Sequence, residues 1–192
     1  MVGNIMIDSL VDNLEQARRS PILRNLGIDP GNYVYVTLHR PANVDDRETL
    51  GRILRELAEI SNRLPILFPV HPRTRQRIAT FQFDSLLNDR IRLLEPLGYH
   101  DSLHLTENAR LVLTDSGGLQ EESTFFQTPC LTLRPNTERP VTCTNRGRGS
   151  RVAPPDRLRG DLASILSKDR RFGSQPPAWD GRSSNRVLES LT

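Results

Sequence analysis

Short apolar segments alternate with amphipathic helical segments along most of this 192-residue chain, and this alternation is the strongest constraint on its fold. Strands separated by helices pair in parallel through right-handed crossovers. The sequence therefore predicts an α/β fold with a doubly wound parallel sheet, whose ligands bind beyond the carboxyl ends of the strands. The apolar runs of strand length are residues 33–38, 66–70, 91–94, 111–114 and 130–133.

Helices are predicted between these strands from the spacing of apolar residues. The clearest helix ends near Asn62, and Asp45 and Asp46 are candidates to cap its start. Its apolar face consists of Leu50, Ile53, Leu54, Leu57 and Ile60. Further helices are expected at residues 4–18, from residue 72, around 101–107, and at 117–126 and 157–166. Residues 134–151, rich in Arg, Thr, Asn and Gly, are interpreted as a loop with one weak strand.

The end of the chain differs in composition from the rest. Residues 171–181 form a linker that contains Pro176, Pro177 and the only tryptophan, Trp179. Ser183 or Ser184 is expected to cap a short helix that ends near residue 191. We therefore divide the chain into a domain at 1–170 and a linker with a helix at 171–192.

Composition excludes several classes of function. The net charge of +3 comes almost entirely from arginine, because Lys168 is the only lysine, and no dense basic stripe predicts a nucleic-acid partner. No apolar run is long enough for a membrane span and no signal segment opens the chain, so a cytoplasmic location is expected. Cys130 and Cys143 fit no metal or redox spacing, and His100 and His104 lack further ligands, so neither a metal nor a cofactor is expected.

The segment 111–122 carries the strongest local signal for a binding site. A strand ends at Thr114, and Ser116-Gly117-Gly118 turns the chain into a helix whose free amides favour a phosphate. The Ser116 hydroxyl can donate to the same group, and the Glu122 carboxylate can accept from ribose hydroxyls. Taken alone, the segment is equally compatible with an ordinary turn followed by solvated glutamates.

Two more strand ends carry residues suited to an anionic ligand. His39 ends the first strand, and Arg139 lies in the loop after the strand at 130–133, where its guanidinium can grip a phosphate. His71 also ends a strand, but we interpret it as structural rather than ligand-contacting. Three phosphate-competent signals at three strand ends predict a binding cleft.

Five segments, read together, resemble the non-hydrolysing UDP-N-acetylglucosamine 2-epimerases in order and spacing. They are Val2-Gly-Asn4, Thr37-Leu-His-Arg40, Pro69-Val-His-Pro72, Thr114-Asp-Ser-Gly-Gly-Leu-Gln-Glu-Glu122 and Thr137-Glu-Arg-Pro140. The resemblance covers essentially the whole chain and identifies it as the carboxy-terminal domain only. It implies one Rossmann-like half of a glycosyltransferase-B-type fold, with the active site between two domains. It also implies interconversion of UDP-N-acetylglucosamine and UDP-N-acetylmannosamine by elimination and re-addition of UDP.

The same resemblance implies that this half holds the UDP. The diphosphate would lie at Ser116, at the amides of Gly117 and Gly118 and at Arg139, and Glu122 would hold the ribose. The remaining UDP-binding residues would be Gln120 and Leu97. The catalytic residue of this half would be His39, near the junction of diphosphate and sugar.

The missing amino-terminal domain would supply the carboxylates that move protons. This part alone is therefore expected to bind UDP weakly and to be inactive, and its last helix to pack toward that domain. The family also suggests a possible homodimer.

Three departures from the family pattern leave alternatives open. An expected acid is missing at Ala42, an aromatic residue is replaced by Ser102, and a Gly-Thr-Asn segment is replaced around Arg148. The alternatives are the nucleotide half of a UDP-sugar glycosyltransferase or hydrolysing epimerase, and a degenerate, non-catalytic nucleotide-binding module.

Overall fold

The computed structural model describes residues 2–144, 150–153, 158–166 and 175–191, and its centre is a six-stranded sheet. All the pairings are parallel, in the order β3-β2-β1-β4-β5-β6. The chain builds outward from β1 to β3 and then returns to place β4 beside β1. This order confirms the predicted doubly wound sheet. The strands are β1 (Val34–Thr37), β2 (Ile66–Pro69), β3 (Ile91–Leu94), β4 (Leu111–Thr114), β5 (Cys130–Leu133) and β6 (Ser150–Ala153).

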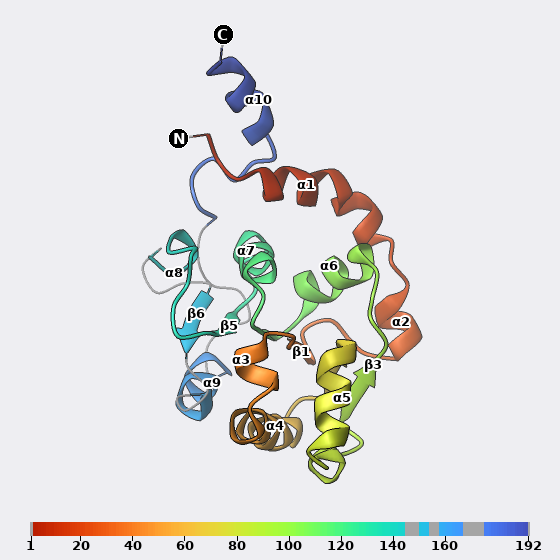
Figure 1. Ribbon diagram of the computed structural model, residues 1–192. Coiled ribbons are helices and arrows are strands. Elements are labelled where there is room, and N and C mark those ends of the chain that lie inside the picture. Colours follow the sequence, from red (N-terminus) through yellow and green to blue (C-terminus); the bar gives the residue numbers. More distant parts are fainter. Residues whose placement is uncertain (1, 145–149, 154–157, 167–174, 192) are drawn as a thin grey trace.

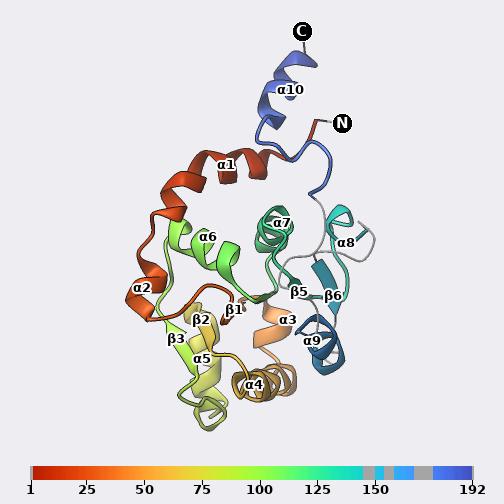
Figure 2. The same cartoon turned by 180° about the vertical axis from the view of Figure 1, so that it is seen from behind.

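Helices cover both faces of the sheet (Figures 1 and 2). On one face lie α1 (Ile5–Arg18), α2 (Ile22–Leu26), α6 (Tyr99–Asn108) and α7 (Gly117–Phe125). On the other lie α3 (Pro41–Val44), α4 (Arg47–Ser61), α5 (Pro72–Thr80) and α9 (Leu158–Leu166), with the short 3-10 helix η1 (Asp84–Leu86) packed on α4. The remaining helices are α8 (Val141–Thr144) and α10 (Ser183–Glu189). Among the described residues, no helix is both long and apolar enough to cross a membrane.

The alternation of side chains along the strands divides the core into two layers. Val34 and Val36 pack with the apolar face of α4, whereas Tyr33 and Tyr35 point to the opposite layer, under α6 and α7. Every residue of the predicted α4 stripe is buried. Its predicted cap is also confirmed, because the Asp46 carboxylate accepts a hydrogen bond from the backbone N–H of Thr49 at 2.7 Å.

The structure contains short helices that the sequence did not predict. Helices α2 and α3 were not predicted, since each is about one turn long and lacks a periodic apolar face. The segment 134–151 contains α8 and the start of β6, so its weak strand is present, at its far end. Residues 145–149 of that loop and 171–174 of the linker lie outside the described residues.

The last helix is anchored on α1 by one buried carboxylate. Asp8 accepts hydrogen bonds from the backbone N–H groups of Ser183 and Ser184, at 3.0 and 2.7 Å. The predicted cap was therefore wrong: both serines lie inside the first turn of α10, and Asp8 of α1 caps it from outside. Burial acts to raise the pKa of Asp8, but the hydrogen bonds from Ser184 and Ser183 outweigh it and lower the pKa to about 2. Trp179, just before α10, is buried against Ile7 and its neighbours on α1.

Replacing Asp8 by alanine should release α10. The loss of a helix cap costs about 1 kcal/mol of unfolding free energy, and the fluorescence of Trp179 should shift toward that of an exposed indole. Because the pKa of Asp8 is lowered, its contribution is present above about pH 4 and is lost on acidification toward about pH 2. Urea unfolding followed by tryptophan fluorescence measures both effects. Asp12→Ala, an exposed acid on the same helix, is the matched control, and equal losses in the two variants would contradict the cap.

Candidate functional site

The carboxyl ends of β1 and β4 lie side by side where the strand order reverses. Thr37 and Thr114 are register partners, and their hydroxyl oxygens are 2.7 Å apart. Doubly wound sheets bind ligands in the crevice outside such a reversal. The residues that follow these two strands include His39 and the turn Ser116-Gly117-Gly118. The fold therefore brings the first two sequence signals together.

A fully buried carboxylate, Asp115, joins the two strand ends. It accepts hydrogen bonds from the backbone N–H groups of His39 and Arg40, at 3.1 and 2.9 Å, and from Nδ2 of Asn43 at 3.1 Å. Its Oδ1 is also 3.0 Å from Nδ1 of His39. Sequence reasoning gave no role to Asp115 or Asn43. The only available signal was an acid placed directly after a strand, inside the glycine-containing motif.

This contact controls the charge and direction of the His39 ring. Burial acts to raise the pKa of Asp115, but the hydrogen bonds from His39, Arg40 and Asn43 lower it overall. The hydrogen bond to Asp115 raises the pKa of His39, against the opposing effect of its partial burial. Because Nδ1 faces Asp115, Nε2 is the ring nitrogen left for a ligand. His39 is thus an oriented imidazole, favoured in its cationic form, at the edge of the crevice.

The motif that begins α7 presents two faces. Gly117, Gln120 and Glu121 are spaced so that they share one side of the helix, and that side faces the loop carrying Arg139. Gly118 and Glu122 share the adjoining side, toward α1 and α6.

On the side of α7 that faces the loop after β5, the Arg139 guanidinium lies against the first turn of the helix. A side chain at Gly117 would place its Cβ 2.4 Å from Nη1 of Arg139, so only glycine leaves room for the guanidinium. Gln120 is fully buried: its Nε2 donates to the Thr142 hydroxyl at 2.5 Å, and its Oε1 accepts from the Thr137 hydroxyl at 3.2 Å. The Gln120 side chain therefore fixes the loop, and the structure joins the Arg139 signal to the glycine turn.

Ser116 starts α7 as its cap. Its Oγ accepts from the N–H of Leu119 at 3.4 Å, and its own N–H donates to the Thr114 hydroxyl at 2.9 Å. The hydroxyl hydrogen of Ser116 is still available to donate to a ligand.

On the adjoining face, Glu122 is a carboxylate with an unusual pKa. Burial, and then the negative charge of Glu121, raise the pKa of Glu122 to about 7. Burial and the charge of Glu122 together raise the pKa values of Tyr35 and Tyr99 to about 12. This electrostatic coupling places Glu122 near β1 and the start of α6.

A cavity of about 510 Å³ opens at the carboxyl ends of β1, β2 and β3. His39 and His71 line it, with ring centroids 6.1 Å apart, and the predicted site residue Leu97 lines it too. His71 also caps α5, because its Nδ1 accepts from the N–H of Arg73 at 3.2 Å.

Ser102 lines the same cavity together with Tyr35. The Tyr35 hydroxyl lies 2.9 Å from the Ser102 Oγ, and Tyr35 is almost fully buried. A tyrosine on β1 thus contributes an aromatic ring beside the serine that departs from the family pattern. Of the other departures, Ala42 lies in α3, and Arg148 lies outside the described residues.

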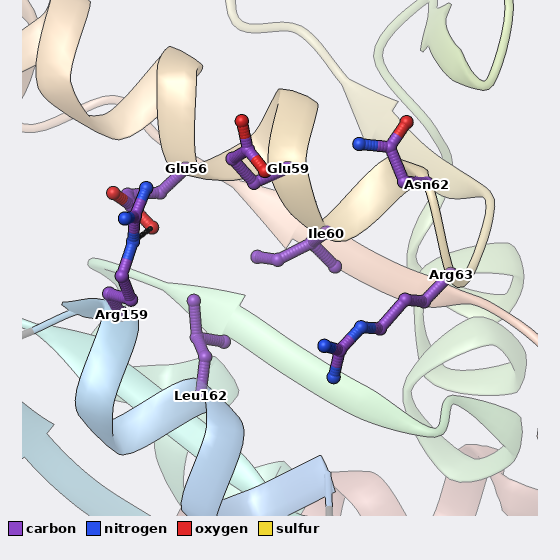
Figure 3. A pocket seen from close by; sticks show the side chains of 7 residues that line it. All are labelled: Glu56, Glu59, Ile60, Asn62, Arg63, Arg159 and Leu162. Carbon is purple, nitrogen blue, oxygen red and sulfur yellow. Dashed lines mark hydrogen bonds and ion pairs between the residues drawn. The ribbon is translucent and has the colours of Figure 1, made fainter.

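Two further cavities lie elsewhere. One of about 530 Å³ is next to Arg139, between residues 2–5, the loop 138–141 and the start of α10. The other, of about 390 Å³, lies between α4 and α9, where Glu56 pairs with Arg159 at 3.1 Å (Figure 3). Asn62 and Arg63 of this second cavity come just before β2, so it lies toward the amino ends of the strands and holds no predicted site residue. Among the described residues, no group of three or more His, Cys, Asp or Glu could hold a metal ion.

The whole chain, residues 1–192, matches the family described as UDP-N-acetylglucosamine 2-epimerase. The chain belongs to this family. It is 38% identical to the UDP-N-acetylglucosamine 2-epimerase of Methanocaldococcus jannaschii, over all of this chain and 54% of that protein. It is 40% identical, over 74% of this chain and 39% of the relative, to the UDP-2,3-diacetamido-2,3-dideoxy-D-glucuronate 2-epimerase of Pseudomonas aeruginosa.

Among solved structures, the chain resembles that of the M. jannaschii epimerase in complex with UDP-GlcNAc and UDP. The TM-score is 0.84 at 37% identity, covering all of this chain and 54% of the other. The family and fold predicted from the sequence are confirmed. The chain spans about half the length of the family members that it matches.

Replacing Asp115 by asparagine should lower the pKa of His39, because the hydrogen bond that stabilises the imidazolium is lost and the opposing effect of burial remains. The measurement is a pH titration of the His39 ring signals by NMR, assigned with a His39→Ala variant. Asn43→Ala, which removes a different partner of the same carboxylate, should leave most of the His39 shift in place. An unchanged His39 titration in Asp115→Asn would show that another group raises its pKa.

Proposed function

We propose that this chain is the UDP-binding half of a UDP-N-acetylglucosamine 2-epimerase, which interconverts that substrate and UDP-N-acetylmannosamine. The observation that carries the proposal is the convergence of His39, the Ser116-Gly117-Gly118 turn and Arg139 beside the strand reversal. The M. jannaschii structure, which contains UDP-GlcNAc and UDP, supports the same ligand class for this fold.

The diphosphate would bind at the start of α7. The backbone N–H groups of Gly117 and Gly118 and the Ser116 hydroxyl offer donors to phosphate oxygens, and the Arg139 guanidinium adds a positive charge. When the bond between C1 of the sugar and UDP breaks, negative charge grows on the departing phosphate. Donors fixed in advance stabilise that charge in the transition state. His39, whose pKa is raised by its hydrogen bond to Asp115, would act at the same junction.

The ribose and base would occupy the neighbouring cavity. The Glu122 carboxylate would accept hydrogen bonds from the ribose hydroxyls. Leu97 would supply apolar contact to the base, and the Tyr35–Ser102 hydroxyl pair would supply a polar partner for it. Gln120 would act indirectly, by fixing the loop that carries Arg139.

The proton transfers at C2 of the sugar would come from a second domain that packs against the ends of this one. Large apolar side chains are exposed at Val2 and Ile5, which line the cavity beside Arg139, and at Leu188 of α10. Figure 1 shows α10 extending away from the sheet beside the N-terminus. We propose that these apolar side chains contact that domain and that the tail at 171–192 bridges to it. Cytoplasmic location and a homodimer stay predictions from the sequence.

A second candidate function differs from the first only in the sugar of the UDP-sugar substrate. The similarity to the P. aeruginosa relative favours a different UDP-sugar, with a diacetamido uronic acid in place of N-acetylglucosamine. Incubating the full-length protein with each UDP-sugar and analysing the products would decide between them. Free UDP with a glycosylated acceptor would indicate a glycosyltransferase, and free UDP with a released sugar would indicate a hydrolysing epimerase.

Arg139→Ala should weaken UDP binding about tenfold or more, because a charge-assisted contact to the diphosphate is lost. Calorimetric titration of this chain with UDP measures the effect, and His39→Ala should weaken UDP in the same direction. Arg63→Ala, in the α4–α9 cavity, is the control and should bind UDP normally. Unchanged affinity in Arg139→Ala and His39→Ala would exclude the crevice and favour a non-catalytic module.

UDP affinity should also depend on the protonation of Glu122. Only the ionised carboxylate accepts from both ribose hydroxyls, and its pKa is about 7. The affinity should therefore rise about tenfold between about pH 6 and pH 8, beyond the change due to the ligand's own phosphate. Glu122→Gln keeps the titration of the ligand and of His39 but lacks that of Glu122, so the difference between the two profiles is the contribution of Glu122. Identical pH profiles in the two proteins would remove Glu122 from the ribose site.

A further inference from the structure

Glu121 is next in sequence to Glu122, the proposed ribose-binding residue. Its two carboxylate oxygens contact two separate segments of the chain. Its Oε2 is 3.0 Å from Nε of Arg139, and its Oε1 accepts a hydrogen bond from Nδ2 of Asn4 at 2.9 Å. The Glu121 side chain is only 10% exposed. The carboxylate is therefore removed from water and depends on these partners for its stabilisation.

The position of Glu121 beside an anion site needs an explanation. A carboxylate next to a bound diphosphate repels it, so Glu121 would weaken binding unless it performed another task. An arginine side chain has many rotamers, and an ion pair with a buried carboxylate at Nε restricts them. The contact at Nε is close without being aligned as a hydrogen bond, and the terminal nitrogens lie farther along the side chain, where they can reach a phosphate. Gly117 supplies the surface on which the guanidinium rests, and Gln120 fixes the backbone of its loop.

A second carboxylate near Arg139 does not offer the same control. Glu138 Oε2 lies 3.5 Å from Nη1 of Arg139, and its side chain is 71% exposed. Exposed ion pairs of this kind contribute little, because water and side-chain freedom compete with them. Glu121 is the carboxylate able to define the direction of the guanidinium.

The other partner, Asn4, belongs to a segment with little freedom. Its Oδ1 accepts from the N–H of Met6 at 3.0 Å and caps α1. The preceding Gly3 has φ +104°, and a Cβ there would lie 2.4 Å from the carbonyl oxygen of Ala178. Residues 2–4 are thus packed against the segment that leads into α10. A shift of this segment would reach Glu121 through Asn4.

We propose that Glu121 is a positioning residue that directs Arg139 toward the diphosphate and couples this direction to residues 2–4 through Asn4. The inference rests on the proposed function, because it assumes that Arg139 contacts the diphosphate. Glu121 and Asn4 would thus affect the affinity for UDP through Arg139, without contacting the ligand themselves.

The first test is Glu121→Gln, with affinities for UDP and UMP measured by calorimetry on the 192-residue chain. UDP should weaken about tenfold, whereas UMP, which lacks the second phosphate, should change much less. The control Glu138→Gln removes the other nearby carboxylate and should leave UDP affinity within about twofold of the unaltered chain. Equal losses for UDP and UMP, or equal effects of the two substitutions, would overturn the positioning role.

The second test asks whether Glu121 acts through Arg139. In an Arg139→Ala background, Glu121→Gln should no longer weaken UDP, because no guanidinium is left to position and the substitution removes a negative charge near the diphosphate. A loss of UDP affinity as large as in the unaltered background would overturn the inference. Asn4→Ser keeps a capping oxygen for α1 but removes the donor to Glu121, so it should weaken UDP in the same direction. If Glu121→Gln does not fold by circular dichroism, Asn4→Ser decides the case.

These outcomes separate the two proposals. If the unaltered chain binds UDP and Arg139→Ala binds it more weakly, while Glu121→Gln and Asn4→Ser bind normally, the proposed function stands and the positioning role is wrong. If the unaltered chain fails to bind UDP, the proposed function fails, and this inference fails with it.

Discussion

The buried carboxylate of Asp115 is the constraint on which the rest of the crevice depends. An ionised carboxylate without partners is too costly to bury, so the chain must bring donors to it. Those donors come from the end of β1, from the ring of His39 and from Asn43 in α3. Asn43 also donates to the carbonyl of Leu133 at the end of β5. A single acid therefore links three strand ends, the third through Asn43, and orients a half-exposed histidine whose pKa it raises.

Helix α7 supplies the groups of the proposed anion site, and its first turns contact two different neighbours. Its start presents backbone amides and a capping serine, one face carries the arginine loop, and the next carries a partly protonated glutamate. Residues adjacent in sequence, Glu121 and Glu122, consequently have different surroundings. One is paired with a cation and an amide, and the other is desolvated beside two tyrosines.

The sequence predicted the sheet, the long helices and the meeting of His39 with the glycine turn, because periodicity and strand ends are local features. It could not predict Asp115 as the centre, since its partners lie more than 70 residues away and no pattern marks a buried acid. Gln120 is predicted as a UDP-binding residue because it belongs to the motif, and the sequence could not show that its buried side chain also hydrogen-bonds to Thr142 and Thr137 of the loop. The predicted cap of α10 was wrong because Asp8 reaches the helix from the other end of the chain.

The contact between Gly117 and Arg139 also limits how this family can vary. With the guanidinium resting where a Cβ would stand, any larger residue at position 117 displaces the arginine. The constraint acts in one direction, because a shorter residue at position 139 would remove the clash and place no demand on position 117. Relatives that keep the arginine in this position should therefore carry glycine at 117, and a larger residue at 117 should mark sequences in which the arginine has moved or been lost.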